Sequence, residues 1–319
     1  MASVETVRGP VDSGALGGTL MHEHVFVFTP EFRENYPELI GWDEEARLED
    51  ATNRLRDVKN AGIDTFVDLT VIGMGRDVSR LQKLNESVDL NIIVATGMYT
   101  YDELPWHLKF PLPDGAPAAP DPMVRMFVRD ITRGIADTGI KAAILKCCTD
   151  RPGVTPGVER VLRSVALAHR ETGAPISTHT DSRTHRGLEQ QDIFASEGVD
   201  LTRVVIGHSG DTDDYDYLKA MLDRGSYLGM DRFGYYGPGT LTFAERVGVV
   251  AELCELGYAR QLVLSHDLQC WLDWVPGEIP PDRNFTHIST KVLPALRERG
   301  VREGDIDLMI RQNPARIFG

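Results

Sequence analysis

Two histidines, His22 and His24, are separated by one residue in an apolar segment, TLMHEHVFV (19–27), that has the character of a β-strand. Side chains alternate between the two faces of a strand, so both imidazoles should point the same way. Two imidazoles on one face suit a single metal ion, since histidine is the commonest metal ligand in proteins. The pair could equally hydrogen-bond to the backbone, and both interpretations stay open from this motif alone.

Four other ionisable residues lie towards the ends of segments that also resemble strands. They are Lys146 in 142–149, His179 in 175–180, His208 in 203–209 and Asp267 in 261–267. If these segments are parallel strands of a barrel, their carboxyl ends meet on the face where the active sites of that fold lie. We therefore expect the four side chains to join the histidine pair in one metal centre.

Lys146 is the unusual member of this set, because an ammonium group would repel the cation that the imidazoles bind. Burial beside cations lowers the pKa of a lysine, and its free amine can react with carbon dioxide to give a carbamate, an anionic donor able to bridge two metals. The residue alone also allows an ion pair with a carboxylate, or a Schiff-base lysine. A Schiff-base enzyme, however, would not need the HxH pair and the two later histidines.

Three further histidines lack this placement. His169 lies late in a helical segment and His185 in a loop, so we expect both on the solvated surface. His266 directly precedes Asp267, and should therefore point to the opposite face of the same strand.

The elements that must position these residues alternate along the chain. Eight short segments rich in β-branched residues recur between segments of helical periodicity, which indicates βα units and a parallel sheet. The eight segments are 19–27, 64–71, 91–99, 142–149, 175–180, 203–209, 226–233 and 261–267. Between a helical segment and the next strand lies a glycine, as expected for a left-handed residue after a helix, at Gly62, Gly139, Gly173, Gly198, Gly225 and Gly257.

This pattern predicts an α/β fold, a (β/α)8 TIM barrel that takes up residues 1–319 as a single domain. An open doubly wound sheet is the alternative, but no glycine-rich phosphate-binding fingerprint follows any predicted strand. The stretches 102–122 and 268–286 read as long loops after the third and eighth strands. Long strand-to-helix loops belong at the catalytic face of a barrel.

The composition excludes several functional classes. The chain has 48 acidic and 34 basic side chains, a formal charge of −14 that repels nucleic-acid phosphates and anionic lipids. No segment approaches the ~18 apolar residues of a membrane span, and the N-terminus lacks the pattern of a secretory signal. We therefore expect a cytoplasmic protein without nucleic-acid or membrane partners. Cys147, Cys148, Cys254 and Cys270 form no CxxC pair and should be reduced thiols.

Together these motifs resemble the phosphotriesterase-like branch of the amidohydrolase superfamily, and within it the phosphotriesterase-like lactonases. The similarity runs almost end to end and rests on the segments TLMHEHVF, VDLTVIGMGRD, IIVATGMYTY, ILKCCTD, GAPISTHT, RVVIGHSGD, SYLGMDRFG, LVLSHD and NPARIFG. Mononuclear deaminases of the superfamily also begin with HxH, but they would carry HxxE where this chain has HTDSR.

The resemblance implies a binuclear centre with two divalent metal ions per chain, zinc or alternatively cobalt, manganese or iron. The more buried metal would be bound by His22, His24 and Asp267, and the more exposed one by His179 and His208. Carboxylated Lys146 and a hydroxide would bridge the two metals. Asp267 would also carry a proton towards the leaving group.

Two residues match residues that are typical of the lactonases and not of the phosphotriesterases. Tyr99 in GMYTY matches a lactonase tyrosine that lies over the metals beside the substrate ring, and Arg232 in MDRFG matches a lactonase arginine. Each has a simpler interpretation, Tyr99 as an amphipathic rim residue and Arg232 as a surface ion-pair partner. An apolar surface for an acyl tail, or for a dimer contact, is offered by Trp271, Leu272, Trp274 and Val275.

We therefore expect a homodimeric enzyme that hydrolyses N-acyl-homoserine lactones or other γ- and δ-lactones, with weak activity on phosphotriesters. The alternatives are a dedicated phosphotriesterase that takes organophosphate esters and, from a different class, a non-catalytic ligand-binding barrel. The last alternative would call for a missing metal ligand, whereas the pattern of ligands is complete.

Overall fold

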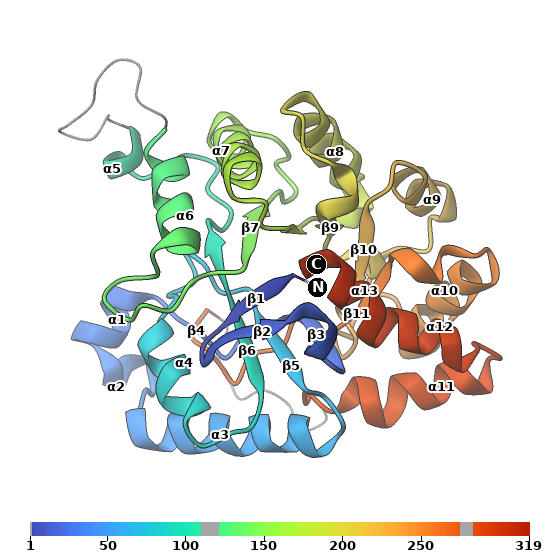
Figure 1. Cartoon of the computed structure of the whole chain (residues 1–319), viewed down its shortest axis with the longest axis horizontal. Helices are drawn as coiled ribbons and strands as arrows, with labels where there is room; N and C mark the ends of the chain where they lie inside the picture. Colours follow the sequence, from blue (N-terminus) through green and yellow to red (C-terminus); the bar gives the residue numbers. More distant parts are fainter. Residues whose placement is uncertain (1, 110–120, 275–282) are drawn as a thin grey trace.

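The computed structural model describes residues 2–109, 121–274 and 283–319. Eight parallel strands lie at its centre in the order β3-β5-β6-β7-β8-β9-β10-β11, and helices surround them (Figure 1). The strands are β3 (Thr19–Glu23), β5 (Thr65–Asp68), β6 (Asn91–Gly97), β7 (Ile144–Cys148), β8 (Ile176–His179), β9 (Val204–Ile206), β10 (Tyr227–Met230) and β11 (Leu262–Leu264). All eight predicted strands are confirmed, although each is shorter than its sequence segment.

The first and last strands, β3 and β11, are joined by hydrogen bonds that lie just beyond the end of β11. The amide of Asp267 donates to the carbonyl of His22 at 2.9 Å, and the amide of His24 donates to the carbonyl of Leu268 at 2.9 Å. The amide of His22 also donates to the hydroxyl of Ser265 at 2.9 Å. With helices following the strands, this arrangement confirms the predicted TIM barrel.

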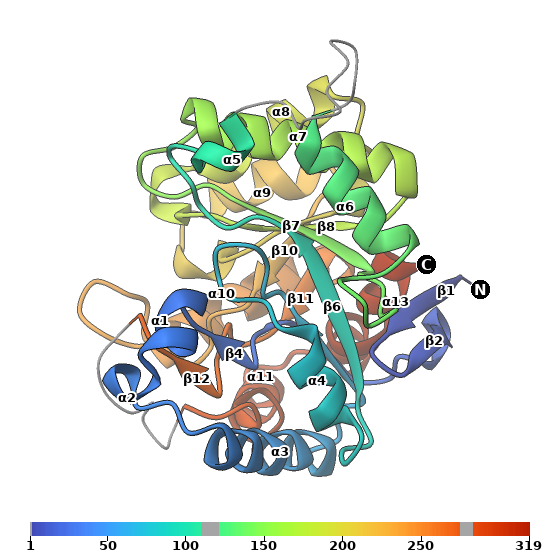
Figure 2. The same ribbon diagram turned by 90° about the vertical axis from the view of Figure 1, so that its left-hand side faces the viewer.

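Helices cover the outside of the strands (Figures 1 and 2). The main ones are α3 (Glu44–Asn60), α4 (Val78–Asn85), α6 (Pro122–Thr132), α7 (Pro156–Thr172), α8 (Arg186–Ser196), α9 (Tyr215–Asp223), α10 (Phe243–Glu255), α11 (Leu293–Glu298), α12 (Glu303–Asp307) and α13 (Asn313–Phe318). In α3, residues three and four apart share one face, and this face is buried through Leu48, Ala51, Leu55 and Val58. All six predicted glycines have a positive φ, and Gly173 directly caps α7 at φ 74°.

Shorter elements lie at the two ends of the barrel. The antiparallel hairpin of β1 (Ser3–Thr6) and β2 (Gly9–Asp12) contacts the beginning of β6, where the amide of Val7 donates to the carbonyl of Ile92 at 2.8 Å. Both chain ends lie beside this hairpin (Figures 1 and 2). At the opposite end, β4 (Phe26–Val27) pairs in parallel with β12 (Trp271–Leu272), and α1 (Pro30–Asn35) and α2 (Pro37–Ile40) follow β4.

The two stretches predicted as plain loops contain regular structure. The first includes α5 (Trp106–Lys109) and the second includes β12. Their parts at 110–120 and 275–282 lie outside the described residues. Single 3-10 turns occur at Ser13–Ala15, Ser182–Thr184, Leu201–Arg203, Ser209–Asp211 and Tyr258–Gln261, and π turns at Ile288–Val292 and Leu308–Gln312.

Apolar side chains fill the barrel below the carboxyl ends of its strands. One buried cluster takes a residue from each of several strands, among them Val67, Ile93, Ile144, Val205 and Val263. Residues at alternate positions of the strands belong to a larger cluster shared with the helices. Lys146 comes two residues after Ile144 in β7 and so shares its inward face. The apolar interior is therefore the floor beneath the predicted metal centre.

The cysteines and the hydropathy agree with the sequence expectations. All four cysteines are buried and form no disulfide. None of the helices in the described residues combines the length and the apolar character that crossing a membrane requires.

Candidate metal centre

The six predicted ligand residues come together at the carboxyl ends of five barrel strands. His22 lies in β3, Lys146 in β7 and His179 at the end of β8, while His24, His208 and Asp267 follow β3, β9 and β11. All six residues are at most 8 % exposed. The convergence expected from the order of the strands is therefore present.

Asp267 lies between two groups of histidines. Its Oδ1 is 3.1 Å from Nε2 of His24 and 3.5 Å from Nε2 of His22, and its Oδ2 is 3.7 Å from Nε2 of His208. In the second group, Nε2 of His208 is 2.8 Å from Nδ1 of His179. The amine of Lys146 lies 2.9 Å from Nε2 of His22.

These donors fit divalent metal ions. Burial, followed by the charge of Lys146, lowers the pKa of His22 to about 3, and burial lowers the pKa of His179 well below its usual range. Both imidazoles are therefore neutral, which is the form that binds a metal. One ligand atom each from His22, His208 and Asp267 lies within 4.8 Å of the others. Imidazole nitrogen and carboxylate oxygen are donors that zinc prefers.

Asp231, which the sequence analysis missed, holds one histidine from each group. Its Oδ2 lies 2.7 Å from Nδ1 of His22, and its Oδ1 lies 3.0 Å from Nδ1 of His208 and accepts the His208 amide at 2.8 Å. Burial would raise the pKa of Asp231, but the two histidines hold it well below its usual range. A carboxylate on Nδ1 directs the Nε2 lone pair towards a metal, so Asp231 orients both groups at once.

Glu23 was also missed, although it lies between the two histidines of the HxH pair. It points to the other face of β3 and is fully buried. Its Oε1 accepts the amide of His266 at 2.9 Å and its Oε2 accepts the amide of Leu268 at 3.0 Å. Asp267, between these two residues, has φ 56°, a left-handed conformation that is uncommon outside glycine. Glu23 thus holds both sides of the turn that presents Asp267.

Asp231→Asn should weaken metal binding while leaving the barrel folded. The amide has nearly the same shape, but its single acceptor oxygen cannot serve both histidines. Losing such a partner costs about 10- to 100-fold in metal affinity. Metal retention against graded chelator concentrations measures the effect, and the melting temperature reports on folding. Asp216→Asn, at a side chain that is 95 % exposed, is the control, and equal retention by the two variants would contradict the role of Asp231.

Tyr99 and Arg232 border the cluster. The ring centroid of Tyr99 is 5.6 Å from that of His179, and burial raises the pKa of its hydroxyl, which therefore stays protonated. Arg232 donates from Nε to Oδ2 of Asp267 at 3.1 Å and from Nη1 to Asp211 at 2.9 Å. Arg232 is therefore more than a surface ion-pair partner, because it contacts a predicted metal ligand directly.

A cavity of about 140 Å³ opens over these side chains. Apart from the polar residues, its lining includes Val27, Met74, Leu272 and Trp274. Trp271 was expected on the same surface, but it packs against Trp42 with their ring centroids 6.2 Å apart, because neighbouring residues of a strand point to opposite sides. Val275 lies outside the described residues. Two of the four residues expected to form the apolar surface therefore face the cavity.

The expectation for His169 is wrong. His169 is buried, with its Nδ1 2.8 Å from the carbonyl oxygen of Ala174, which follows α7. His185 is exposed as expected. His266 also lies as expected, since its Nδ1 is 2.6 Å from Glu23 on the far side of the strand from the cluster.

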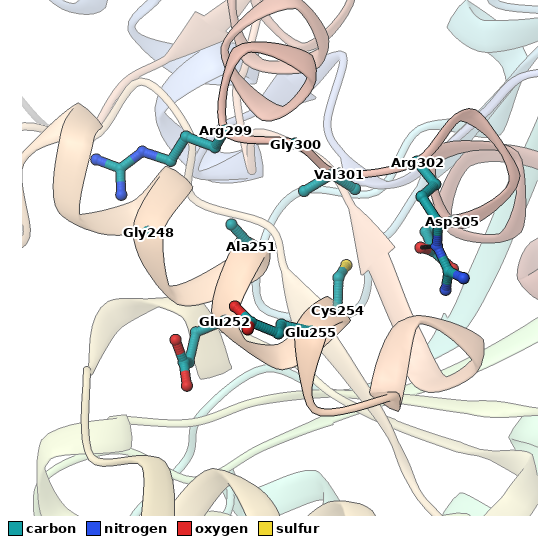
Figure 3. Close-up of a pocket in the computed structure, with 10 residues that line it drawn as sticks. All are labelled: Gly248, Ala251, Glu252, Cys254, Glu255, Arg299, Gly300, Val301, Arg302 and Asp305. Carbon is teal, nitrogen blue, oxygen red and sulfur yellow. Dashed lines mark hydrogen bonds and ion pairs between the residues drawn. The ribbon is translucent and has the colours of Figure 1, made fainter.

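A separate groove of about 510 Å³ lies on the outside of the barrel, between α10 and residues 299–305 (Figure 3). The thiol of Cys254 lines it, and burial raises the pKa of this thiol to about 12. Arg302 is paired there with Asp305 at 2.8 Å. The groove shares no residue with the histidine cluster, and a protonated thiol is a poor nucleophile, so we assign the chemistry to the barrel mouth.

Comparisons with known proteins identify the family of this chain. The phosphotriesterase family model matches residues 2–318. A Mycobacterium tuberculosis protein named phosphotriesterase homology protein is 52 % identical over 322 residues, which cover 100 % of this chain and 98 % of that protein. An aryldialkylphosphatase of Saccharolobus solfataricus is 36 % identical, with 98 % of each chain covered.

A solved structure described as the phosphotriesterase from Mycobacterium tuberculosis superposes with a TM-score of 0.94 at 53 % identity. The match covers 99 % of this chain and 98 % of that one. The chain therefore belongs to the phosphotriesterase family, and the protein is a metal-dependent hydrolase that acts on ester bonds.

Proposed function

We propose that this enzyme is a lactonase that opens N-acyl-homoserine lactones or other γ- and δ-lactones and hydrolyses phosphotriesters weakly. The main support for the proposal is the position of Tyr99 and Arg232, the two residues that match residues typical of lactonases. The Tyr99 ring lies against His179, and Arg232 bonds Asp267. Both line the cavity, whose apolar wall of Leu272 and Trp274 suits an acyl tail.

Two divalent ions would complete the site. His22, His24 and Asp267 would hold one ion and His179 and His208 the other, with carboxylated Lys146 between them. Zinc suits this combination of nitrogen and oxygen donors. When bound, the ions would polarise the ester carbonyl and lower the pKa of water from 15.7 to roughly 7.

We assign the proton transfer to Asp267. Burial would raise its pKa, but the surrounding imidazoles and Arg232 hold it well below its usual range, so the carboxylate begins the reaction as an anion. It can accept a proton at the reacting centre and pass it to the leaving alkoxide oxygen. In a lactone this oxygen stays tethered to the acyl carbon, and the distance for the transfer remains short.

Tyr99→Phe should reduce lactone hydrolysis more than phosphotriester hydrolysis. We assign the Tyr99 hydroxyl to a hydrogen bond with the lactone ring, and an unmade buried hydrogen bond costs about 1 to 3 kcal/mol, or roughly 5- to 150-fold in kcat/KM. Metal content should not change, because Tyr99 is not a ligand. The measurement is kcat/KM for a homoserine lactone and for paraoxon, on both proteins.

The same experiment tests the proposed function through the wild-type ratio of the two activities. A wild-type enzyme that prefers paraoxon would be a dedicated phosphotriesterase, the alternative favoured by the 36 % identity to an aryldialkylphosphatase. Equal losses on both substrates in Tyr99→Phe would remove Tyr99 from the argument. Tyr101→Phe is the matched control, since Tyr101 is near in sequence but is not part of the cavity lining.

A further inference from the structure

A second hollow, of about 380 Å³, opens beside the cavity of the metal centre. The two share three lining residues, namely Tyr99, His179 and Arg232. The other lining residues of the second hollow are all polar or charged: Asp150, Arg151, Thr180, Asp181, Arg183 and Asp211. The second hollow is therefore adjacent to the cavity of the metal centre, and these three side chains border both.

The polar and apolar linings occupy different parts of the barrel mouth. Apart from Tyr99, the residues of the second hollow lie at the end of β8 or follow β7, β8, β9 and β10, four neighbouring strands. The apolar residues of the first cavity follow β3, β5 and β11 on the other side. The site therefore presents an apolar wall to one arm of a substrate and a charged wall to the other.

Two arginines of the charged wall are oriented by one carboxylate. Asp181 has a side chain that is 7 % exposed, and it accepts Nε of Arg151 at 3.1 Å and Nε of Arg183 at 3.1 Å. The Arg151 and Arg183 side chains are 71 % and 51 % exposed. Within the described residues, both Nη groups of Arg151 and Nη1 of Arg183 have no hydrogen-bond partner. Several guanidinium donors thus remain for a ligand.

The remaining charges of the hollow are largely matched. Asp211 is paired with Arg232 at 2.9 Å and with buried Arg246 at 2.6 Å. Asp150 accepts the amide of Arg151 at 2.7 Å and adds one negative charge to the lining. Three arginines and three aspartates line the hollow, so an anion would be recognised by hydrogen bonds from the exposed guanidinium groups and not by a net positive charge. A second negative charge on the ligand would therefore add little.

We propose that this hollow is a subsite for a substrate carboxylate, recognised by Arg151 and Arg183. The planar guanidinium matches the geometry of a carboxylate and donates to it from fixed directions. The preferred substrates would then be lactones or esters with an apolar arm against Leu272 and Trp274 and a carboxylate arm towards β7–β10. This inference rests on the proposed ester-hydrolysing site and names the class of substrate that it takes.

The test compares two γ-lactones that differ only at the end of one side chain, a carboxylate in one and a carboxamide in the other. Wild-type enzyme should favour the carboxylate in kcat/KM, mainly through a lower KM, and the preference should shrink with added salt. Arg151→Gln and Arg183→Gln should each reduce the carboxylate-to-carboxamide ratio about three- to tenfold, because both side chains are half exposed or more.

Arg170→Gln is the matched control. It removes the same charge from an exposed residue at the end of α7, on the opposite side of the barrel from the carboxyl ends of the strands. Its ratio should equal that of the wild type. The melting temperatures of all variants show whether they are folded. A ratio that is the same in wild type and in the Arg151→Gln/Arg183→Gln double variant would overturn the subsite.

A binding measurement separates failure of the subsite from failure of the lactonase proposal. Glutarate and butyrate carry two carboxylates and one, and calorimetry on the metal-loaded enzyme gives both affinities. The subsite predicts tighter binding of glutarate, with the advantage lost in the double variant. If no lactone is hydrolysed, the lactonase proposal fails and the binding comparison alone tests the subsite. Loss of the glutarate preference in the double variant would then support the subsite, and an unchanged preference would overturn it.

Discussion

Lys146→Ala should abolish metal binding and hydrolase activity together. Lys146 is 1 % exposed, and burial lowers the pKa of its amine, so the neutral form that reacts with carbon dioxide is favoured. In the proposed modification, carbon dioxide would form an N–C bond with the amine with release of one proton, and the anionic carbamate would bridge the two groups of candidate ligands. Alanine would supply no bridge, and Asp267 would then be the only anionic side chain among the proposed ligands of two cations. Elemental analysis should find two divalent ions per wild-type chain and both lost in the variant.

The control for this experiment is Lys141→Ala. Lys141 lies before β7 and pairs with Glu5 at 3.0 Å near the surface, so its loss should change neither metal content nor turnover. Added acetate or propionate should restore part of both in Lys146→Ala, because a small carboxylate can take the place of the carbamate. Wild-type metal content and turnover in Lys146→Ala would refute the bridge.

Strand periodicity was sufficient to predict where the candidate ligand residues come together. His22 lies in β3 and His24 directly follows it, and both line the cavity. His179, His208 and Asp267 each end a segment that the sequence marks as a strand, and parallel order alone brings those ends together. These inferences are local, since they depend on alternation within a strand and on the regular succession of strands and helices.

The residues that sequence reasoning missed act through contacts between strands. Asp231 contacts His22, which is 209 positions away in the sequence, and His208, which is 23 positions away. The segment MDRF does not indicate either partner. Glu23 was not considered beside the two histidines, although a carboxylate on the buried face of a strand requires hydrogen-bond donors. His169 shows the converse error, because its burial depends on the carbonyl of Ala174 beyond the end of its helix.

Asp267→Asn should depress turnover on lactones and phosphotriesters alike, by about 100- to 10,000-fold for the loss of general acid–base catalysis. Asparagine is the informative replacement, because it tolerates the left-handed conformation that Asp267 adopts at φ 56°. The amide keeps the shape of the side chain but cannot accept and release the proton. Measuring kcat/KM on both substrate classes contrasts this variant with Tyr99→Phe, whose loss should be confined largely to lactones.

Asp267 is also a proposed metal ligand, and comparison with Asp231→Asn separates its two roles. Asp231 orients His22 and His208 without touching the substrate cavity, so excess metal should refill the site in Asp231→Asn and restore most of its turnover. The same excess should refill Asp267→Asn without restoring turnover, because the proton carrier is still absent. Recovery of wild-type turnover in metal-saturated Asp267→Asn would show that Asp267 acts only as a metal ligand and that another group transfers the proton.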